Sequence, residues 1–317
     1  MASIWSRKSQ LVTVPAEHAW WAASTQCPVV HKVRPDLWRI FFGARDYGNR
    51  TRTIFADVNP KDEMRVVRLN DRPVVAPRVG DFPDSDGIFI SCFAPTGDTL
   101  SAYTIEIHRC NAVQFSGTTG LLQSHDDGLS FSRPTDEAVL GGDYKNPDYY
   151  IAPCVLKRAD GLHVWFARMV RWDLTAKPAP EYYYEIWHAR SDDGLHWTIS
   201  PKAALPLQGD ECGITRPWVQ ERPDGLLEMW YCRRGTYDTG NPKARHYTLG
   251  YALSEDGLSW QRREDLHRFS NPPQPGDWDH EMQCYASVVA DEDGQEFMFY
   301  SGNDYGRESF GYAVRDR

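Results

Sequence analysis

Ser254-Glu-Asp-Gly-Leu-Ser-Trp260 is the third copy of the turn motif that decides how this 317-residue chain folds. The earlier copies begin at Ser124 and Ser191, and each has an aromatic residue three positions after its glycine. The copies start 67 and 63 residues apart, which indicates one supersecondary unit used repeatedly along the chain.

A second series of turns alternates with the first. Asp-Gly pairs at 160–161, 224–225 and 293–294 each lie between two hydrophobic runs. This pattern predicts hairpins, because both residue types tolerate a positive φ. Each unit therefore holds two hairpins, or one blade of four antiparallel strands. About five units fit the length, so we predict an all-β chain that is a single five-bladed β-propeller domain over residues 1–317.

The last unit is predicted to need a strand from the other end of the chain. Its third strand is expected over 310–314, after which almost no sequence remains. We expect residues 4–12 to supply the fourth strand and so to remove an exposed sheet edge. A long aromatic loop is expected to run through Tyr182-Tyr-Tyr184.

Composition narrows the possible partners. The formal net charge is −9 with no basic stripe, which argues against nucleic acid. No apolar run reaches the roughly 18 residues of a membrane span, and no apolar leader is present, so we expect a cytoplasmic protein with no membrane partner. Seven cysteines without Cys-x-x-Cys spacing favour free thiols, no metal and no cofactor. The oligomeric state stays open.

The strand order places both series of turns on one face and the long loops on the other. Loops on a rigid scaffold carry function more often than turns do, so the site is expected on the long-loop rim. Carboxylates gathered there shift one another's pKa values, as general acid/base chemistry on a glycosidic bond requires. The candidate catalytic residues are Glu281, Glu211 and Asp148.

The same rim gathers residues suited to holding a substrate. Arginine forks bind carboxylate or phosphate in a bidentate manner, which favours an anionic sugar; alternatively, the arginines only neutralise the neighbouring acids. The candidate binding residues are Arg45, Asp46, Asp86, Arg168, Arg216, Arg233, Arg234, His280 and Asn303.

Several segments resemble a known superfamily. Met229-Trp-Tyr-Cys232 and Leu249-Gly-Tyr-Ala252, followed by the third turn motif, resemble the blade signature of five-bladed propeller glycosidases of glycoside hydrolase families 43, 32 and 130. The turns also resemble the structural Asp-box turns of sialidases. Gly213–Trp218 and Trp278–Met282 look like segments of uncharacterised propeller proteins of bacterial polysaccharide gene clusters, which implies sugar metabolism.

The sequence departs from this superfamily at two positions. The arabinanase-like and invertase-like groups carry an Asp before a Pro in the first inner strand, where this chain has Gln26-Cys27-Pro28. In the third unit they carry a Glu before a Pro, where this chain has Ala152-Pro153. The hydrolytic pair is therefore not carried over.

Three functions follow as hypotheses. The first is an enzyme that acts on a glycosidic bond of an anionic or activated sugar by transfer, phosphorolysis or hydrolysis. Its partner would be a sugar, a sugar phosphate or a nucleotide sugar. The second is a non-catalytic sugar-binding propeller derived from a glycosidase. The third is a small-molecule tailoring enzyme that reuses the fold.

Overall fold

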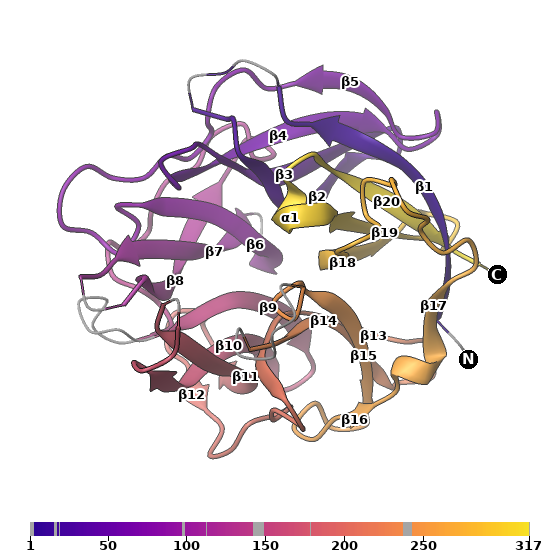
Figure 1. Cartoon of the computed structure of the whole chain (residues 1–317). Helices are drawn as coiled ribbons and strands as arrows, with labels where there is room; N and C mark the ends of the chain where they lie inside the picture. Colours follow the sequence, from indigo (N-terminus) through magenta and orange to yellow (C-terminus); the bar gives the residue numbers. More distant parts are fainter. Residues whose placement is uncertain are drawn as a thin grey trace.

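The computed structural model describes residues 3–15, 18, 20–96, 99–111, 113–141, 149–177, 179–236 and 243–316. Asp148 and the predicted turn at Gly97-Asp98 lie outside these residues. The regular secondary structure of the described chain is almost entirely β-strand, and its sheets are arranged around a central axis (Figure 1). No described helix has the length and apolar character needed to span a membrane.

Strands that follow one another in sequence pair antiparallel, as the two hairpins per unit predict. One group consists of β2 (Ser24–Arg34), β3 (Leu37–Arg45), β4 (Thr51–Asn59) and β5 (Arg65–Leu69). The next consists of β6 (Gly87–Thr96), β7 (Thr99–Arg109) and β8 (Phe115–Ser124).

The middle of the chain repeats this pattern. One group consists of β9 (Tyr150–Arg158), β10 (Gly161–Asp173), β11 (Glu181–Ser191) and β12 (Thr198–Ile199). Another consists of β13 (Glu211–Glu221), β14 (Leu227–Gly235), β15 (Thr248–Ser254) and β16 (Gln261–Arg262). The prediction of a loop through residues 182–184 is wrong. These residues belong to β11, because the β10–β11 ladder continues to Asp173 and Glu181.

The last group combines both ends of the chain. It contains β18 (Cys284–Ala290), β19 (Glu296–Ser301), β20 (Ser309–Arg315) and β1 (Ser3–Thr13). β1 pairs antiparallel with β20, from Trp5 opposite Arg315 to Thr13 opposite Ser309. A short strand that the sequence did not indicate, β17 (His267–Phe269), then pairs parallel to β1. Between neighbouring groups of the chain, single parallel pairs such as Thr51 with Gly87 make the sheets mixed.

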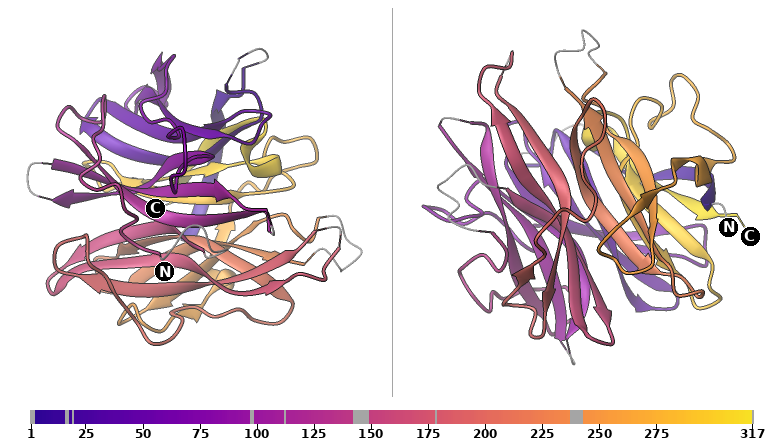
Figure 2. Two further views of the ribbon diagram at one scale, coloured as in Figure 1. Left: turned by 90° about the vertical axis from the view of Figure 1, so that its left-hand side faces the viewer. Right: turned by 90° about the horizontal axis from the view of Figure 1, so that it is seen from below.

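The hydrophobic core lies between neighbouring groups. In β3, every residue from Trp38 to Ala44 is buried, because both faces of this strand are covered. Phe42 packs on Phe310 across the closure between the first and last groups. Figure 2 shows the sheets side by side in two further views, with the two termini close together.

Four inner strands carry the same backbone irregularity. Cys27, Ala152, Arg216 and Tyr285 all have a positive φ between 53° and 59°. Each lies at a break in the pairing register of its strand, on β2, β9, β13 and β18. A bulge re-aims the side chain that it carries, and a left-handed conformation is costly for a residue with a Cβ. All four side chains line the same cavity.

The repeated turns lie at the opposite ends of the strands from this cavity. In β8, for example, Phe115 at one end lines the cavity and Ser124 at the other begins the turn. The serine hydroxyl accepts the glycine N–H at 2.8 Å in all three copies. These residues are turn residues, as the sequence predicts.

Candidate functional site

A cavity of about 730 Å³ lies where the inner strands converge. Its basic side chains are Arg45, Arg109, Arg216, Arg234 and Arg245. Its aromatic side chains are Phe89, Phe115, Tyr149, Tyr182, Tyr247, Tyr285 and Tyr305. Its remaining side chains are Gln26, Cys27, Asn49, Ile105, Ile107, Gln114, Ile151, Ala152 and Thr215. Among the described residues, no aspartate or glutamate lines it.

Arg216 is the arginine of this cavity whose charge is least offset by polar partners. It projects from the bulge in β13, and its side chain is 1% exposed. All three guanidinium nitrogens are buried, and none has an oxygen partner among the described residues; the nearest polar group that acts on them is the thiol of Cys27. Its charge acts on the thiol of Cys27, although burial raises the pKa of that thiol more than the charge lowers it. Burying a cation without a partner costs free energy, and a bound anion would offset that cost.

Arg45 is the second cation without a carboxylate partner among the described residues. It lies at the end of β3 and donates from Nε to Thr51 Oγ1 at 3.2 Å. The adjacent Asp46 pairs with Arg52 at 2.9 Å instead. Burial lowers the pKa of Arg45, but from so high a value that it stays charged.

Arg234 and Arg245 share one buried carboxylate. Glu181 Oε1 lies 3.1 Å from Arg234 Nη2 and 3.5 Å from Arg245 Nη2. Arg234 also donates to the hydroxyl of Tyr184 at 2.6 Å, which fixes the direction of its fork. Glu181 therefore positions two arginines of the cavity lining. The sequence prediction did not include Glu181 and Arg245, because its candidates came from the starts of the first strand and the ends of the second strand of each unit.

Arg109 lies at the end of β7 and is half-exposed. Asp86 holds it through the Arg109 backbone N–H at 2.9 Å and the guanidinium at 3.4 Å. Asp86 therefore positions an arginine of the cavity and does not line the cavity itself.

Tyrosine hydroxyls supply the polar groups between the arginines. Burial raises the pKa values of Tyr149, Tyr247 and Tyr285, so these phenols stay protonated at neutral pH. Tyr247 shares a hydrogen bond with Tyr184, and its ring meets Tyr305 edge to face. A protonated phenol can donate to and accept from a ligand, as the hydroxyls of a sugar require.

The two described catalytic candidates are held by ion pairs outside the cavity lining. Glu211 forms a bidentate pair with Arg262 at 2.7 and 2.9 Å. Glu281 is exposed and pairs with Lys243 at 2.5 Å. This pair lowers the pKa of Glu281, whereas a general acid needs a raised one.

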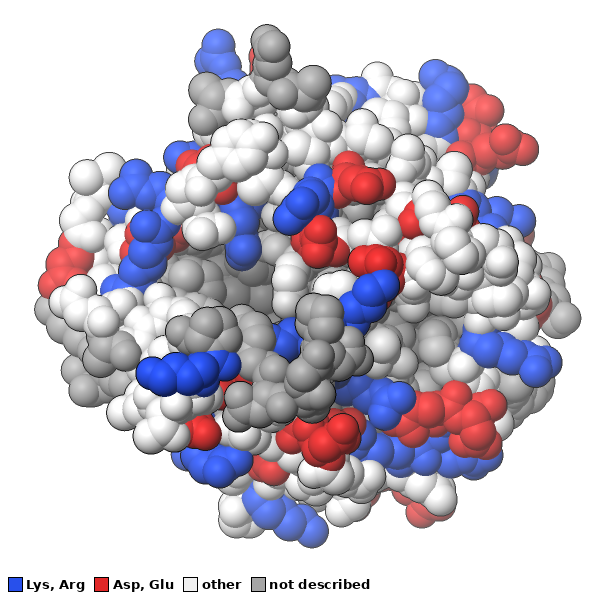
Figure 3. All heavy atoms as spheres, viewed as in Figure 1, with Lys and Arg blue, Asp and Glu red and all other residues white. Residues whose placement is uncertain are grey.

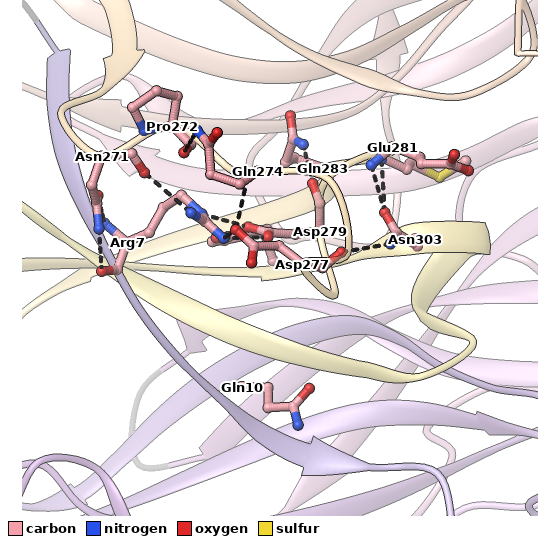
Figure 4. Close-up of polar contacts among 12 residues, drawn as sticks. Arg7, Gln10, Asn271, Pro272, Gln274, Asp277, Asp279, Glu281, Gln283 and Asn303 are labelled. Atoms are coloured by element: carbon pink, nitrogen blue, oxygen red, sulfur yellow. Dashed lines mark hydrogen bonds and ion pairs between the residues drawn. The ribbon is translucent and has the colours of Figure 1, made fainter.

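The other predicted binding residues also lie outside the lining. Arg168 stacks on Trp187, Arg233 lies 3.9 Å from Glu211, and His280 is exposed. Asn303, in the short helix α1 (Asn303–Gly306), accepts the backbone N–H groups of Glu281 and Met282 (Figure 4). On the face in Figure 3, acidic and basic side chains alternate, as expected where most rim charges form pairs. No group of three potential metal ligands occurs among the described residues.

Two cavity positions coincide with those where the resembled hydrolases carry their acids. Cys27 and Ala152 each precede a proline, have a positive φ and line the cavity. A thiol and a methyl group therefore lie at the two positions where the resemblance implies carboxylates.

No family model matches the chain. It is 28% identical over 311 residues to the uncharacterized protein Rv1502 of Mycobacterium tuberculosis, covering 98% of both chains. A glycosyl hydrolase from Bacteroides ovatus has a TM-score of 0.72 at 14% identity, covering 100% of this chain and 94% of that one.

Two further solved structures belong to named glycosidase families. One belongs to work on the GH130 family of mannoside phosphorylases, a family that contains glycoside hydrolases of β-1,2 mannosidic linkages. Its TM-score is 0.71 at 13% identity, covering 99% of this chain and 94% of that one. A thermostable family-43 glycoside hydrolase has a TM-score of 0.64 at 15% identity, covering 93% and 89%. These likenesses confirm the resemblance to propeller glycosidases at the level of the fold.

Proposed function

We propose that residues 1–317 form one five-bladed propeller and that its axial cavity binds an anionic sugar. The five-blade interpretation is supported by the consecutive groups of antiparallel strands and by the pairing of β1 with β20. The proposed ligand is a sugar phosphate, a nucleotide sugar or a uronic acid, or a sugar together with inorganic phosphate.

The buried, unpartnered guanidinium of Arg216 carries this proposal. Arg216 and Arg45 line the cavity without a carboxylate partner among the described residues. The described lining therefore holds five arginines and no carboxylate, in a protein whose formal net charge is −9. A bound anion would offset charges that burial makes costly.

A carbohydrate ligand is supported by the fold and by the tyrosine lining. The similar solved structures include glycoside hydrolases and a protein of the GH130 phosphorylase family. Protonated tyrosines beside arginines can pair with sugar hydroxyls and with an attached anion.

Action on a glycosidic bond with Glu281, Glu211 and Asp148 stays a prediction. The absence of any described carboxylate from the lining favours the alternative, a sugar-binding propeller without catalysis. Asp148 lies outside the described residues but directly precedes Tyr149, which lines the cavity. If the chain is an enzyme, Asp148 is therefore the first of the three to test.

The experiment compares sugar phosphates, nucleotide sugars and uronic acids with their neutral parent sugars by calorimetry and thermal shift. We expect binding of at least one anionic sugar and at least tenfold weaker binding of its neutral parent. Arg216→Met should abolish this preference. The same substitution should leave the melting temperature of the empty protein unchanged or raise it, because it removes an unpaired buried cation.

Arg263→Met is the matched control, since Arg263 is partly exposed and its side chain pairs, among the described residues, with the exposed Asp265. Equal binding of charged and neutral sugars, or unchanged binding by the Arg216 variant, would contradict the proposal. Each bound sugar is also assayed for product. Binding without product from any of them would assign the chain as a sugar-binding protein.

A further inference from the structure

One side of the cavity is lined mainly by apolar side chains, with the polar side chains of Arg109, at the end of β7, and Gln114, just before β8, at its edge. We define the apolar wall as Phe89, Ile105, Ile107, Phe115 and Ile151, all of which line the cavity. They come from four consecutive strands, β6 to β9, and so form one continuous surface. Phe89, Ile105 and Ile151 belong to one buried cluster, against which Ile107 and Phe115 pack.

The backbone beside the wall is shaped to accommodate it. A Cβ at Gly117 would lie 2.5 Å from Ile151 Cγ2, and one at Gly43 would lie 3.2 Å from the ring of Phe89. The missing side chains of these two strand residues leave room for Ile151 and Phe89. The wall therefore depends on specific glycines in the neighbouring strands.

Two of the most buried arginines of the cavity come from the other side of the axis. Arg216 and Arg234 belong to β13 and β14, which lie across the axis from β6 and β7 (Figure 1). The cavity thus has a cationic side rich in hydroxyls and an apolar side. Its volume of about 730 Å³ is typical of sites that enclose most of a drug-sized ligand.

A fully hydroxylated sugar would fit the wall badly. Each hydroxyl placed there would lose its hydrogen bonds to water without gaining a partner, and such a loss weakens binding severalfold or more. An alkyl, aryl or acyl group in the same place would instead gain from leaving water.

We infer that the ligand is amphiphilic: an anionic sugar whose charged group meets Arg216 and Arg45 and whose apolar substituent or aglycone lies on the apolar wall. This inference rests on the proposed anionic ligand and adds the class of group attached to it.

The test compares matched pairs of small anions by calorimetry. The probes are methyl and phenyl β-D-glucuronide, methyl and phenyl phosphate, and the neutral phenyl β-D-glucoside. We expect the phenyl member of at least one anionic pair to bind about tenfold more tightly than the methyl member. Ile107→Thr should reduce that preference at least threefold, because it places a hydroxyl in the wall.

Ile199→Thr is the matched control: a partly buried isoleucine of β12, an outer strand, exchanged for the same residue. It should leave the phenyl preference unchanged. Melting temperatures of both variants show whether each folds, and a second wall variant, Phe115→Tyr, adds one hydroxyl at nearly constant shape.

The outcomes separate this inference from the proposed function. If the anions bind but the methyl and phenyl members of both pairs have affinities within twofold of each other, the inference of an apolar substituent is overturned and the anionic ligand is retained. If phenyl glucoside binds as tightly as phenyl glucuronide, the anionic ligand is overturned and the apolar wall is retained as a binding surface. Failure of every anion to bind would overturn both.

Discussion

Glu106 of β7 is an acid buried outside the cavity lining. Its side chain is 4% exposed and accepts a hydrogen bond from Thr118 Oγ1 at 3.1 Å. Burial, reinforced by the negative charge of Asp84, raises its pKa to about 7. Gly120 makes this position possible, since a Cβ there would clash with the carboxyl group.

This raised pKa makes the stability of the protein depend on pH. The native state keeps the proton of Glu106 at pH values where the unfolded chain, with an ordinary pKa near 4.5, has lost it. Stability from this group therefore falls as pH rises from about 4.5 through 7. Between pH 5 and pH 8, the free energy of unfolding of Glu106→Gln should rise by roughly 1 to 3 kcal/mol relative to that of the wild type, as measured by urea unfolding. Glu137→Gln, an exposed control, should show no such trend.

At the residue scale, the sequence predicted part of the site. Arg45 and Arg234 line the cavity because the ends of second strands converge there, as the strand order predicts, and Arg216 of β13 lines it as well. The partners of the acids could not be predicted. Glu211 pairs with a residue 51 positions away and Glu281 with one 38 positions away, and only the folded chain brings them together.

The repeated turn does more than reverse the chain. Each copy packs on an aromatic residue of the preceding group: Phe41, Tyr103 or Trp165. The aromatic residue that follows each turn meets the same ring at centroid distances of 5.8 to 6.0 Å. Trp165 also donates its indole N–H to Gly257 O at 2.7 Å. The motif therefore fixes one group against the next.

This inter-group contact can be separated from the turn conformation. Gly257 and Gly225 have similar positive φ values, 75° and 82°. A Cβ at Gly257 would lie 2.8 Å from Trp165, whereas one at Gly225 would meet nothing within 4 Å. Gly257→Ala should therefore cost about 1 to 3 kcal/mol more stability than Gly225→Ala. Equal losses in denaturant unfolding would show that only the turn matters.

At the element scale, periodic turns predicted most strands to within a few residues, because Asp-Gly pairs fix where hairpins reverse. The limits of β10 and β11 were not predicted: Pro178 and Pro180 precede Glu181, but the aromatic run that follows them was assigned to the loop and not to a strand. β17 has no strand signal of its own and pairs only because β1 is beside it.

At the scale of the whole molecule, a charged cluster holds the first strand in place (Figure 4). Arg7 of β1 donates to Asp279 at 2.5 and 2.8 Å and to Asp277 at 3.0 Å. Asp279 is fully buried and also accepts from Tyr300 at 2.6 Å. The backbone N–H of Arg7 is bound to Asn271 at 2.7 Å.

Breaking this cluster should loosen the closure. Arg7→Met would leave the carboxylate of Asp279 buried without its cation, which costs about 3 to 5 kcal/mol. We expect a large fall in melting temperature and early hydrogen exchange of the β1 and β20 amides. Arg263→Met, which breaks an exposed pair, should change stability by less than about 0.5 kcal/mol. Equal effects of the two substitutions would show that the cluster does not hold β1.

The pairing of Trp5 with Arg315 also has a consequence for synthesis. β1 leaves the ribosome some 300 residues before its partner strand β20. At roughly 5 to 20 residues per second, the nascent chain carries an unpaired strand for about 15 to 60 s. A chaperone that shields β1 during this interval would protect a strand that cannot pair until β20 has been synthesised.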